Sequence, residues 1–295
     1  MKENREIKSS VFTDLFGDDE KEGKKNFLSL YNAIHDTNLK FDEIQIEQKK
    51  IPQTITKTFY NDISMIINGK LIILIEHQST PNNNMPLRCL EYYVHLLYGI
   101  IPAEARYKEA IYKIPTPEFY VFYNGTKKLD KEWFMKLSDA FLEKQEEPVC
   151  EVKVKITNIR GENGENLPVV QKCDILKQYC KFMEIVEYYK AQLKEQPTDE
   201  EMKSSIDKAI EEAISKNILT DYLTRNATEV RNMFQAEYDY NLDMQVKAEE
   251  AREEKAIETA ENFLKKKISP EIISECVGLP LEKVLELQKS IAVEA

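Results

Sequence analysis

The feature that most constrains this chain is the stretch from Asn61 to Gln78, which reads NDISMIINGKLIILIEHQ. Apolar residues recur at every second position from Ile63, an alternation that predicts a half-buried strand. The five apolar residues of Leu71–Ile75 predict a second strand that is buried on both faces. Asn68-Gly69 between them is a strong hairpin signal, because both residues accept a positive φ at little cost. The stretch therefore predicts a β-hairpin inside a sheet.

Acidic residues mark the two ends of this hairpin. Asp62 begins the first strand, and Glu76 ends the second, where His77 and Gln78 follow. Two carboxylates on neighbouring strands can hold a divalent cation, because hard cations such as Mg²⁺ take oxygen ligands and keep several waters. Asp62 and Glu76 therefore predict a site for Mg²⁺ or Mn²⁺. His77 alternates to the other face, so we interpret it as a packing residue.

The length of the hairpin loop decides whether the two carboxylates meet. A two-residue loop pairs Asp62 with Ile75, which leaves Asp62 and Glu76 on opposite faces and would abolish the site. A three-residue loop with a glycine bulge pairs Asp62 with Leu74. Glu76 then lies diagonally across on the same face, roughly 7–8 Å away, and Gln78 shares that face. The metal-site interpretation requires the longer loop or a bulge.

The hairpin is part of a longer set of motifs that resembles the PD-(D/E)XK nuclease superfamily, specifically its bacterial branch of recombination-promoting nucleases and putative transposases. The segments that carry the likeness are Lys57-Thr58, Asn61–Ser64, the block LIILIEHQST, Asn84–Arg88 with Tyr92, and the later strand Pro115–Gly125. The likeness covers about residues 10 to 190. It implies a restriction-endonuclease-like α/β fold, with a mixed sheet flanked by helices.

The resemblance also implies an activity, a metal-dependent DNA endonuclease linked to DNA recombination or mobile elements. Asp62 and Glu76 would ligate the metal and act as catalytic residues. The superfamily usually has Lys where this chain has Gln78, although Gln resembles this particular branch. A Lys can orient the attacking water and stabilise developing charge, whereas an amide can only hydrogen-bond. We therefore interpret Gln78 as the residue that orients the water.

Other site residues are less specific. The superfamily tends to carry an acid on its first helix, and Glu20 and Glu22 lie near that place. Lys57 and Arg88 are candidate DNA contacts, although Arg88 could equally pair with Glu91 on the same helix.

Charge is distributed unevenly and bears on the partner. Of the net charge of −11, residues 1–160 carry 23 Lys and Arg against 24 Asp and Glu, while residues 161–295 carry 18 against 28. We expect weak, salt-sensitive and largely sequence-independent DNA binding by the first part. A second hypothesis is a catalytically silent nucleic-acid-binding or assembly protein that retains the nuclease fold. A transposase proper would need a further end-recognition domain, for which the acidic half is a poor candidate.

The pattern along the chain predicts two regions, a nuclease-like domain over residues 1–195 and an acidic, all-helical region over residues 196–295. A thin apolar seam at Ala256–Leu264 needs a partner surface, either the core or another subunit. We expect a homo-oligomer, most simply a dimer through these C-terminal helices. The terminal helix pair, Pro270–Ser290, resembles a helix-turn-helix, but its acidic residues favour assembly over DNA binding.

Two further expectations concern surroundings and sheet order. The odd, scattered set of five cysteines and the absence of an apolar run of about 18 residues predict buried thiols in a cytoplasmic protein. The segment Glu151–Ile159 alternates strictly, which we interpret as an outer strand of the sheet.

Overall fold

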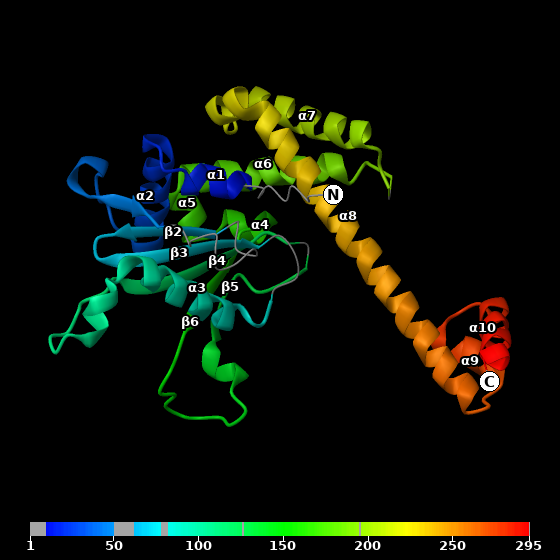
Figure 1. Cartoon of the computed structure of the whole chain (residues 1–295). Coiled ribbons are helices and arrows are strands. Elements are labelled where there is room, and N and C mark those ends of the chain that lie inside the picture. The colour runs from blue at the N-terminus through cyan, green and yellow to red at the C-terminus, as the bar shows by residue number, and fades with distance from the viewer. Residues whose placement is uncertain (1–9, 50–61, 78–81, 126, 195, 295) are drawn as a thin grey trace. The chain divides into compact units, whose positions relative to one another are not determined.

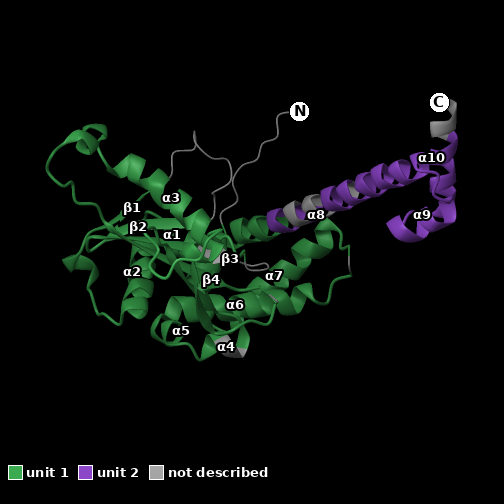
Figure 2. Ribbon diagram, turned by 90° about the horizontal axis from the view of Figure 1, so that it is seen from below, with its two compact units in different colours: residues 1–235 green, residues 236–295 purple. Residues whose placement is uncertain are grey.

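The chain forms an α/β structure, as expected, in which helices cover a mixed β-sheet. The computed structural model describes residues 10–49, 62–77, 82–125, 127–194 and 196–294. These residues form two compact units, residues 1–235 and residues 236–295, which Figure 2 shows in separate colours. The sheet lies in unit 1. The finer assignment to a restriction-endonuclease-like fold remains a proposal.

The sheet has six strands in the order β1-β2-β3-β4-β6-β5. The strands are β1 (Ile46–Gln48), β2 (Asp62–Ile67), β3 (Lys70–His77), β4 (Thr116–Tyr123), β5 (Glu132–Lys136) and β6 (Lys153–Asn158). The first three strands pair antiparallel, β3, β4 and β6 run parallel, and β5 is antiparallel to β6. The carboxyl ends of the three parallel strands therefore lie together at one edge of the sheet.

The expectation of an outer strand at residues 151–159 is wrong. This segment forms β6, which lies between β4 and β5. The alternation in its sequence reflects one incompletely covered face and says nothing about the number of neighbouring strands. The edge strand β5 is only five residues long and alternates between exposed and half-buried side chains, so its apolar signal is weak.

The hairpin forms where the sequence predicts it, but the longer loop is wrong. Ile67 pairs with Lys70 and Asp62 pairs with Ile75, which is the register of a two-residue loop. Asn68 and Gly69 have φ values of 48° and 72°. Positive φ at both loop residues is the geometry of a type I′ turn, whose twist matches that of the flanking strands. Asn-Gly meets this demand directly, so the hairpin closes without a bulge.

The helices cover both faces of the sheet (Figure 1). Those of unit 1 are α1 (Val11–Gly17), α2 (Lys21–His35), α3 (Met85–Ile100), α4 (Gly161–Glu165), α5 (Pro168–Lys172), α6 (Asp174–Lys190), α7 (Asp199–Ser215) and the start of α8 (Thr220–Lys265). Short 3₁₀ helices are η1 (Phe41–Glu43), η2 (Ala103–Tyr107) and η3 (Leu137–Ala140). Unit 2 holds the rest of α8, with α9 (Pro270–Val277) and α10 (Leu281–Glu294).

Each face of the sheet has its own core. On one face, α3 buries Cys89 and Tyr92 in a cluster with Val121 and Ile156 of the parallel strands. On the other face, Phe12 of α1 lies 5.5 Å from the ring of Phe122 and 5.6 Å from that of Tyr179 in α6. Because successive strand residues alternate between faces, the register of a residue tells which core it belongs to.

Unit 1 extends past residue 195, the domain end expected from the sequence, to Gln235. The reason is that α7 and the first turns of α8 pack on the α/β part of the chain. The Tyr222 hydroxyl donates to Asp14 of α1 at 2.7 Å, and the Phe234 ring lies 6.1 Å from Phe182 of α6. The change from mixed to purely helical sequence near residue 197 therefore marks a change in secondary structure within one compact unit.

Unit 2 is a small helical unit with its own core. Its buried residues are Ala260, Leu264, Ile273, Leu279 and Val284. The apolar seam of α8 is thus covered by α9 and α10 of the same unit, so the seam itself does not require a second subunit. Gly278, at φ 74°, ends α9 and turns the chain into α10.

The cysteine expectation holds for three residues of five. Cys89, Cys173 and Cys180 are buried free thiols, whereas Cys150 and Cys276 are exposed. Cys276 lies within α9 and Cys150 in the segment before β6, and a count of cysteines does not reveal that these two are exposed. Within the described ranges, no helix combines the length and the apolar character that a bilayer crossing requires.

A charged network joins α2 to the amino ends of β3 and β4. The Glu118 carboxylate accepts from Lys70 Nζ at 2.6 Å and from the Tyr120 hydroxyl at 2.8 Å. His35 Nε2 lies 2.9 Å from the same carboxylate, without the alignment of a hydrogen bond. Burial lowers the pKa of His35, against the opposing effect of Glu118. The Glu118 carboxylate therefore contacts three side chains, Lys70 of β3, Tyr120 of β4 and His35 of α2.

Replacing Glu118 by Gln should destabilise the protein by about 1–3 kcal/mol, because Lys70 and Tyr120 would lose a charged acceptor in a half-buried site. Urea unfolding measures the change. Glu143→Gln, at an exposed position after η3, is the matched control and should change stability by less than about 0.5 kcal/mol. Equal effects of the two substitutions would show that the network does not stabilise the fold.

Candidate functional site at the carboxyl edge of the sheet

The structure places both acidic candidates at one end of the hairpin but in different registers. Asp62 is the first residue of β2 and pairs with Ile75, which is in register with Val121 of β4. Glu76 is in register with Phe122. Paired positions share a face and successive positions alternate, so position 62 belongs to the sheet face that α3 covers and position 76 to the sheet face that α1 covers. The pairing does not give the shared face that the sequence analysis expected.

The physical reason is the two-residue turn. A single extra loop residue would shift the pairing by one and exchange the face of every residue in one strand. For Asp62 and Glu76 the structure describes the backbone, and the register assigns each of these two positions to a face of the sheet. Gln78 and Lys57 lie outside the described residues.

Arg88 lies in the first turn of α3 and is held by Tyr92. Its Nε donates to the Tyr92 hydroxyl at 2.7 Å, and its guanidinium carbon lies 5.3 Å from the centroid of that ring. Glu91, the other partner that the sequence suggested for Arg88, has its carboxylate 3.8 Å from His95 Nε2. The contacts with Tyr92 hold the Arg88 guanidinium close to the first turns of α3.

Polar residues that the sequence analysis missed follow the other two parallel strands. Asn124 comes directly after β4, and Asn158 ends β6, so both lie at the carboxyl edge with the end of β3. Both are buried. The Nδ2 group of Asn124 has no hydrogen-bond partner among the described residues. The signal was present in the sequence, since each strand runs directly into an Asn.

Arg160 connects this edge to α6. Its guanidinium donates to the Asn124 carbonyl at 3.3 Å and pairs with the Glu187 carboxylate. Burial raises the pKa of Glu187, and the nearby Arg160 charge counteracts that rise. The edge therefore holds a charged pair, Arg160 and Glu187, near the buried Asn124 and Asn158, and this combination can orient a polar ligand.

The first-helix acids that the sequence suggested occupy the start of α2. Glu20 is the N-cap residue of α2, and Glu22 pairs with Arg225 of α8 at 2.8 Å. The acid of α1 is Asp14, which the sequence analysis did not consider. Burial raises its pKa, the hydrogen bond from Tyr222 lowers it, and Asp18 and Glu229 raise it further. Asp14 is thus a half-buried carboxylate on the helix that covers the position-76 face.

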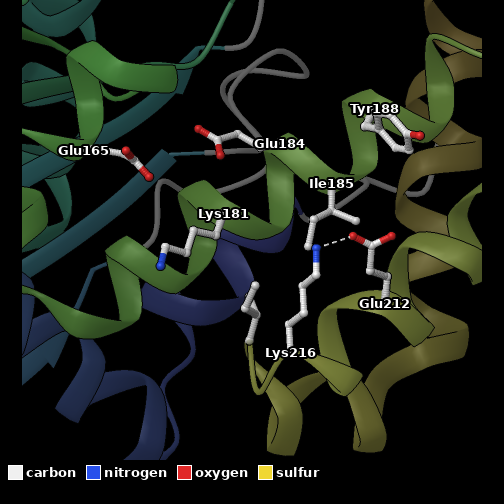
Figure 3. A pocket seen from close by; sticks show the side chains of 8 residues that line it. Glu165, Lys181, Glu184, Ile185, Tyr188, Glu212 and Lys216 are labelled. Carbon is white, nitrogen blue, oxygen red and sulfur yellow. Dashed lines mark hydrogen bonds and ion pairs between the residues drawn. The ribbon is translucent and has the colours of Figure 1, made fainter.

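A separate open pocket of about 430 Å³ lies between α4, α6, α7 and the turn after α7 (Figure 3). Its lining consists of Glu165, Lys181, Glu184, Ile185, Tyr188, Glu212, Lys216 and Ile218. Lys216 pairs with Glu212 at 2.6 Å. Burial, followed by the charges of Glu165 and Glu187, raises the pKa of Glu184. Three acids against two lysines make this pocket a poor surface for a phosphate backbone, and none of the predicted site residues lines it.

The donor chemistry of Asp62 and Glu76 fits a hard cation, because both are carboxylates. Among the side chains that the structure describes, no group of three or more His, Cys, Asp or Glu is arranged to hold a metal ion.

Comparison of the chain with protein-family models, with curated proteins and with solved structures finds no match. The resemblance to the PD-(D/E)XK superfamily therefore remains a prediction from the sequence motifs.

Asp14→Asn tests the half-buried acid of α1. A raised pKa means that the protonated form contributes stability below the unfolded-state value, and that this stability is lost as the pH rises through the folded pKa. An amide still accepts from Tyr222 and does not ionise. The variant should therefore gain stability relative to wild type as the pH rises from about 4 to about 7.

Urea midpoints across this pH range measure the effect, with Asp139→Asn, an exposed acid in η3, as control. A stability difference between the two proteins that stays constant, or that moves in favour of the wild type as the pH rises, would contradict the assigned environment.

Proposed function

We propose that the chain is a Mg²⁺-dependent or Mn²⁺-dependent DNA endonuclease, linked to recombination or mobile elements, whose activity depends on Glu76. The observation that carries the proposal is the place of Glu76. It lies at the end of the central strand, at the carboxyl edge of three parallel strands, where open α/β sheets bind their ligands. The motif block around this residue, which resembles the nuclease superfamily, supports the same assignment.

In this proposal Asp62 and Glu76 would hold the cation. When bound, Mg²⁺ would polarise the phosphate and lower the pKa of a bound water. Gln78 would orient that water through a hydrogen bond, since an amide supplies no charge. Lys57 and Arg88 would contact the DNA backbone, and Arg88 already has its Nε anchored on Tyr92.

The hairpin register weighs against a simple two-carboxylate site. Position 62 belongs to the face opposite position 76, so the Asp62 carboxylate would have to reach around the end of the sheet to share a cation. Asp62 is the first residue of β2, so no further residue of that strand stands between it and the end of the sheet. The proposal therefore depends more on Glu76 as a metal ligand than on Asp62, and the role of Asp62 needs a test of its own.

The same register favours a second candidate, the catalytically silent protein that keeps the fold for nucleic-acid binding or assembly. Such a protein has no need for two converging carboxylates. The net charge of −11 also fits a protein that binds DNA weakly.

Plasmid nicking with and without Mg²⁺ separates the two candidates. The wild type should nick only with the metal. Glu76→Gln should lose at least about 100-fold in rate, because even changes beyond the direct ligands of a metal typically cost 10–100-fold. Asp62→Asn should lose as much if its carboxylate shares the cation.

Glu143→Gln, an exposed acid outside the candidate site, should retain the wild-type rate. Loss of nicking in Glu76→Gln alone would assign the metal to Glu76 without Asp62. If the wild type fails to nick with either Mg²⁺ or Mn²⁺, or if Glu76→Gln nicks normally, the nuclease proposal is wrong and the silent alternative gains support.

A further inference from the structure

The outer face of α3 is unusually apolar. Leu87, Val94 and Tyr98 leave 55%, 41% and 57% of their surfaces exposed. They recur at intervals of seven and four residues, so they share one face of the helix. The opposite face of α3 buries Cys89, Tyr92 and Leu96 against the sheet. The helix is thus apolar on the side that the chain covers and also on the side that it leaves open.

The segment 101–115, which follows α3, continues this surface. Figure 1 shows it projecting from the end of α3 before the chain enters β4. Tyr107 and Ile111 are 88% and 91% exposed, and Tyr112 and Ile114 are also exposed. The Arg106 guanidinium carbon lies 4.5 Å from the centroid of the Tyr98 ring, which joins the segment to the helix. We name this combined surface the α3 face.

The size and composition of the α3 face suit a protein interface. Large apolar side chains exposed as a group, rather than singly, mark interaction surfaces. Tyr and Arg are enriched at the centres of such interfaces. The three tyrosines alone expose on the order of 400 Å², about half of the roughly 800 Å² that each partner contributes to an interface of standard size.

The charges on the α3 face favour a second copy of the chain as the partner. The exposed charged residues of this surface are three basic and three acidic, with both signs interspersed: Glu91, Glu104, Arg106, Lys108, Glu109 and Lys113. Two copies of a chain with a net charge of −11 repel each other over most of their surfaces. The α3 face is balanced in charge, so this repulsion is weak there. In a twofold arrangement each mixed face can set its lysines and arginines against the partner's acids. A nucleic acid would instead favour a face without interspersed carboxylates.

We propose that the α3 face joins two copies of this chain into a twofold dimer. The self-association that the sequence suggested at the C-terminal seam is thereby assigned to unit 1, since unit 2 covers that seam with its own helices. The dimer does not depend on nuclease activity, so its test is separate from the nicking assay.

Sedimentation velocity of the full chain at micromolar concentration tests the proposal. The wild type should be a dimer. The double variant Tyr98→Glu/Ile111→Glu should be a monomer, with a dissociation constant at least about 100-fold higher, since truncating central interface residues typically costs 2 kcal/mol or more and buried like charges cost further. Both positions are exposed, so the double variant should keep the wild-type fold, which its circular-dichroism spectrum checks.

Two controls make the result specific. Leu142→Glu changes a fully exposed leucine outside the α3 face, and Leu285→Glu changes an exposed leucine on α10 of unit 2. Both variants should remain dimers. As a second readout, hydrogen exchange of residues 94–114 should slow as wild-type protein is concentrated, and not in the double variant.

A monomeric wild type overturns the proposal. If the double variant also weakens DNA binding, the α3 face binds nucleic acid instead of a second copy. A dimer that survives Tyr98→Glu/Ile111→Glu and is lost in Leu285→Glu overturns it in favour of the C-terminal helices.

Discussion

The pairing of β3 on both of its edges is the constraint on which the rest of unit 1 depends. This strand binds β2 antiparallel through a two-residue turn and β4 parallel through the crossover that contains α3. Its residues Leu71–Leu74 are buried on both faces, so neither face can be exchanged for the other without exposing part of the core. The register of β3 therefore fixes which residues face α3 and which face α1 and α6.

That constraint has a direct consequence for the acids of the hairpin. Asn68-Gly69 accepts the type I′ geometry at little cost, and the core residues of β2 lock the same register from the other end of the strand. Ile63, Met65 and Ile67 are all essentially inaccessible to solvent. A shift by one residue, which would place positions 62 and 76 on one face, would turn these three side chains out of the core. The cost of that shift is far greater than the benefit of bringing two carboxylates together without a cation.

The acidic helical half has two structural roles that its composition does not separate. The part up to Gln235 completes unit 1, where Tyr222 covers Asp14 and Arg225 pairs with Glu22. The part beyond it forms unit 2 with its own small core. Because helices of both parts are rich in charged residues, the distinction depends on a few buried apolar positions, such as Phe234 in unit 1 and Leu264 in unit 2.

The sequence by itself determined the hairpin and its turn. These depend on local periodicity and on Asn-Gly turn chemistry, which act over a few residues. It also placed Glu76 at the end of the second strand of the hairpin, and the family resemblance implied the α/β class. Only the tertiary structure decided that β6 is an inner strand, that Asn124 and Asn158 meet at one edge, and that the seam of α8 is covered by α9 and α10. Each of these depends on which segments distant in sequence become neighbours. Local patterns carry no information on that choice, which is made by the burial of whole faces at once.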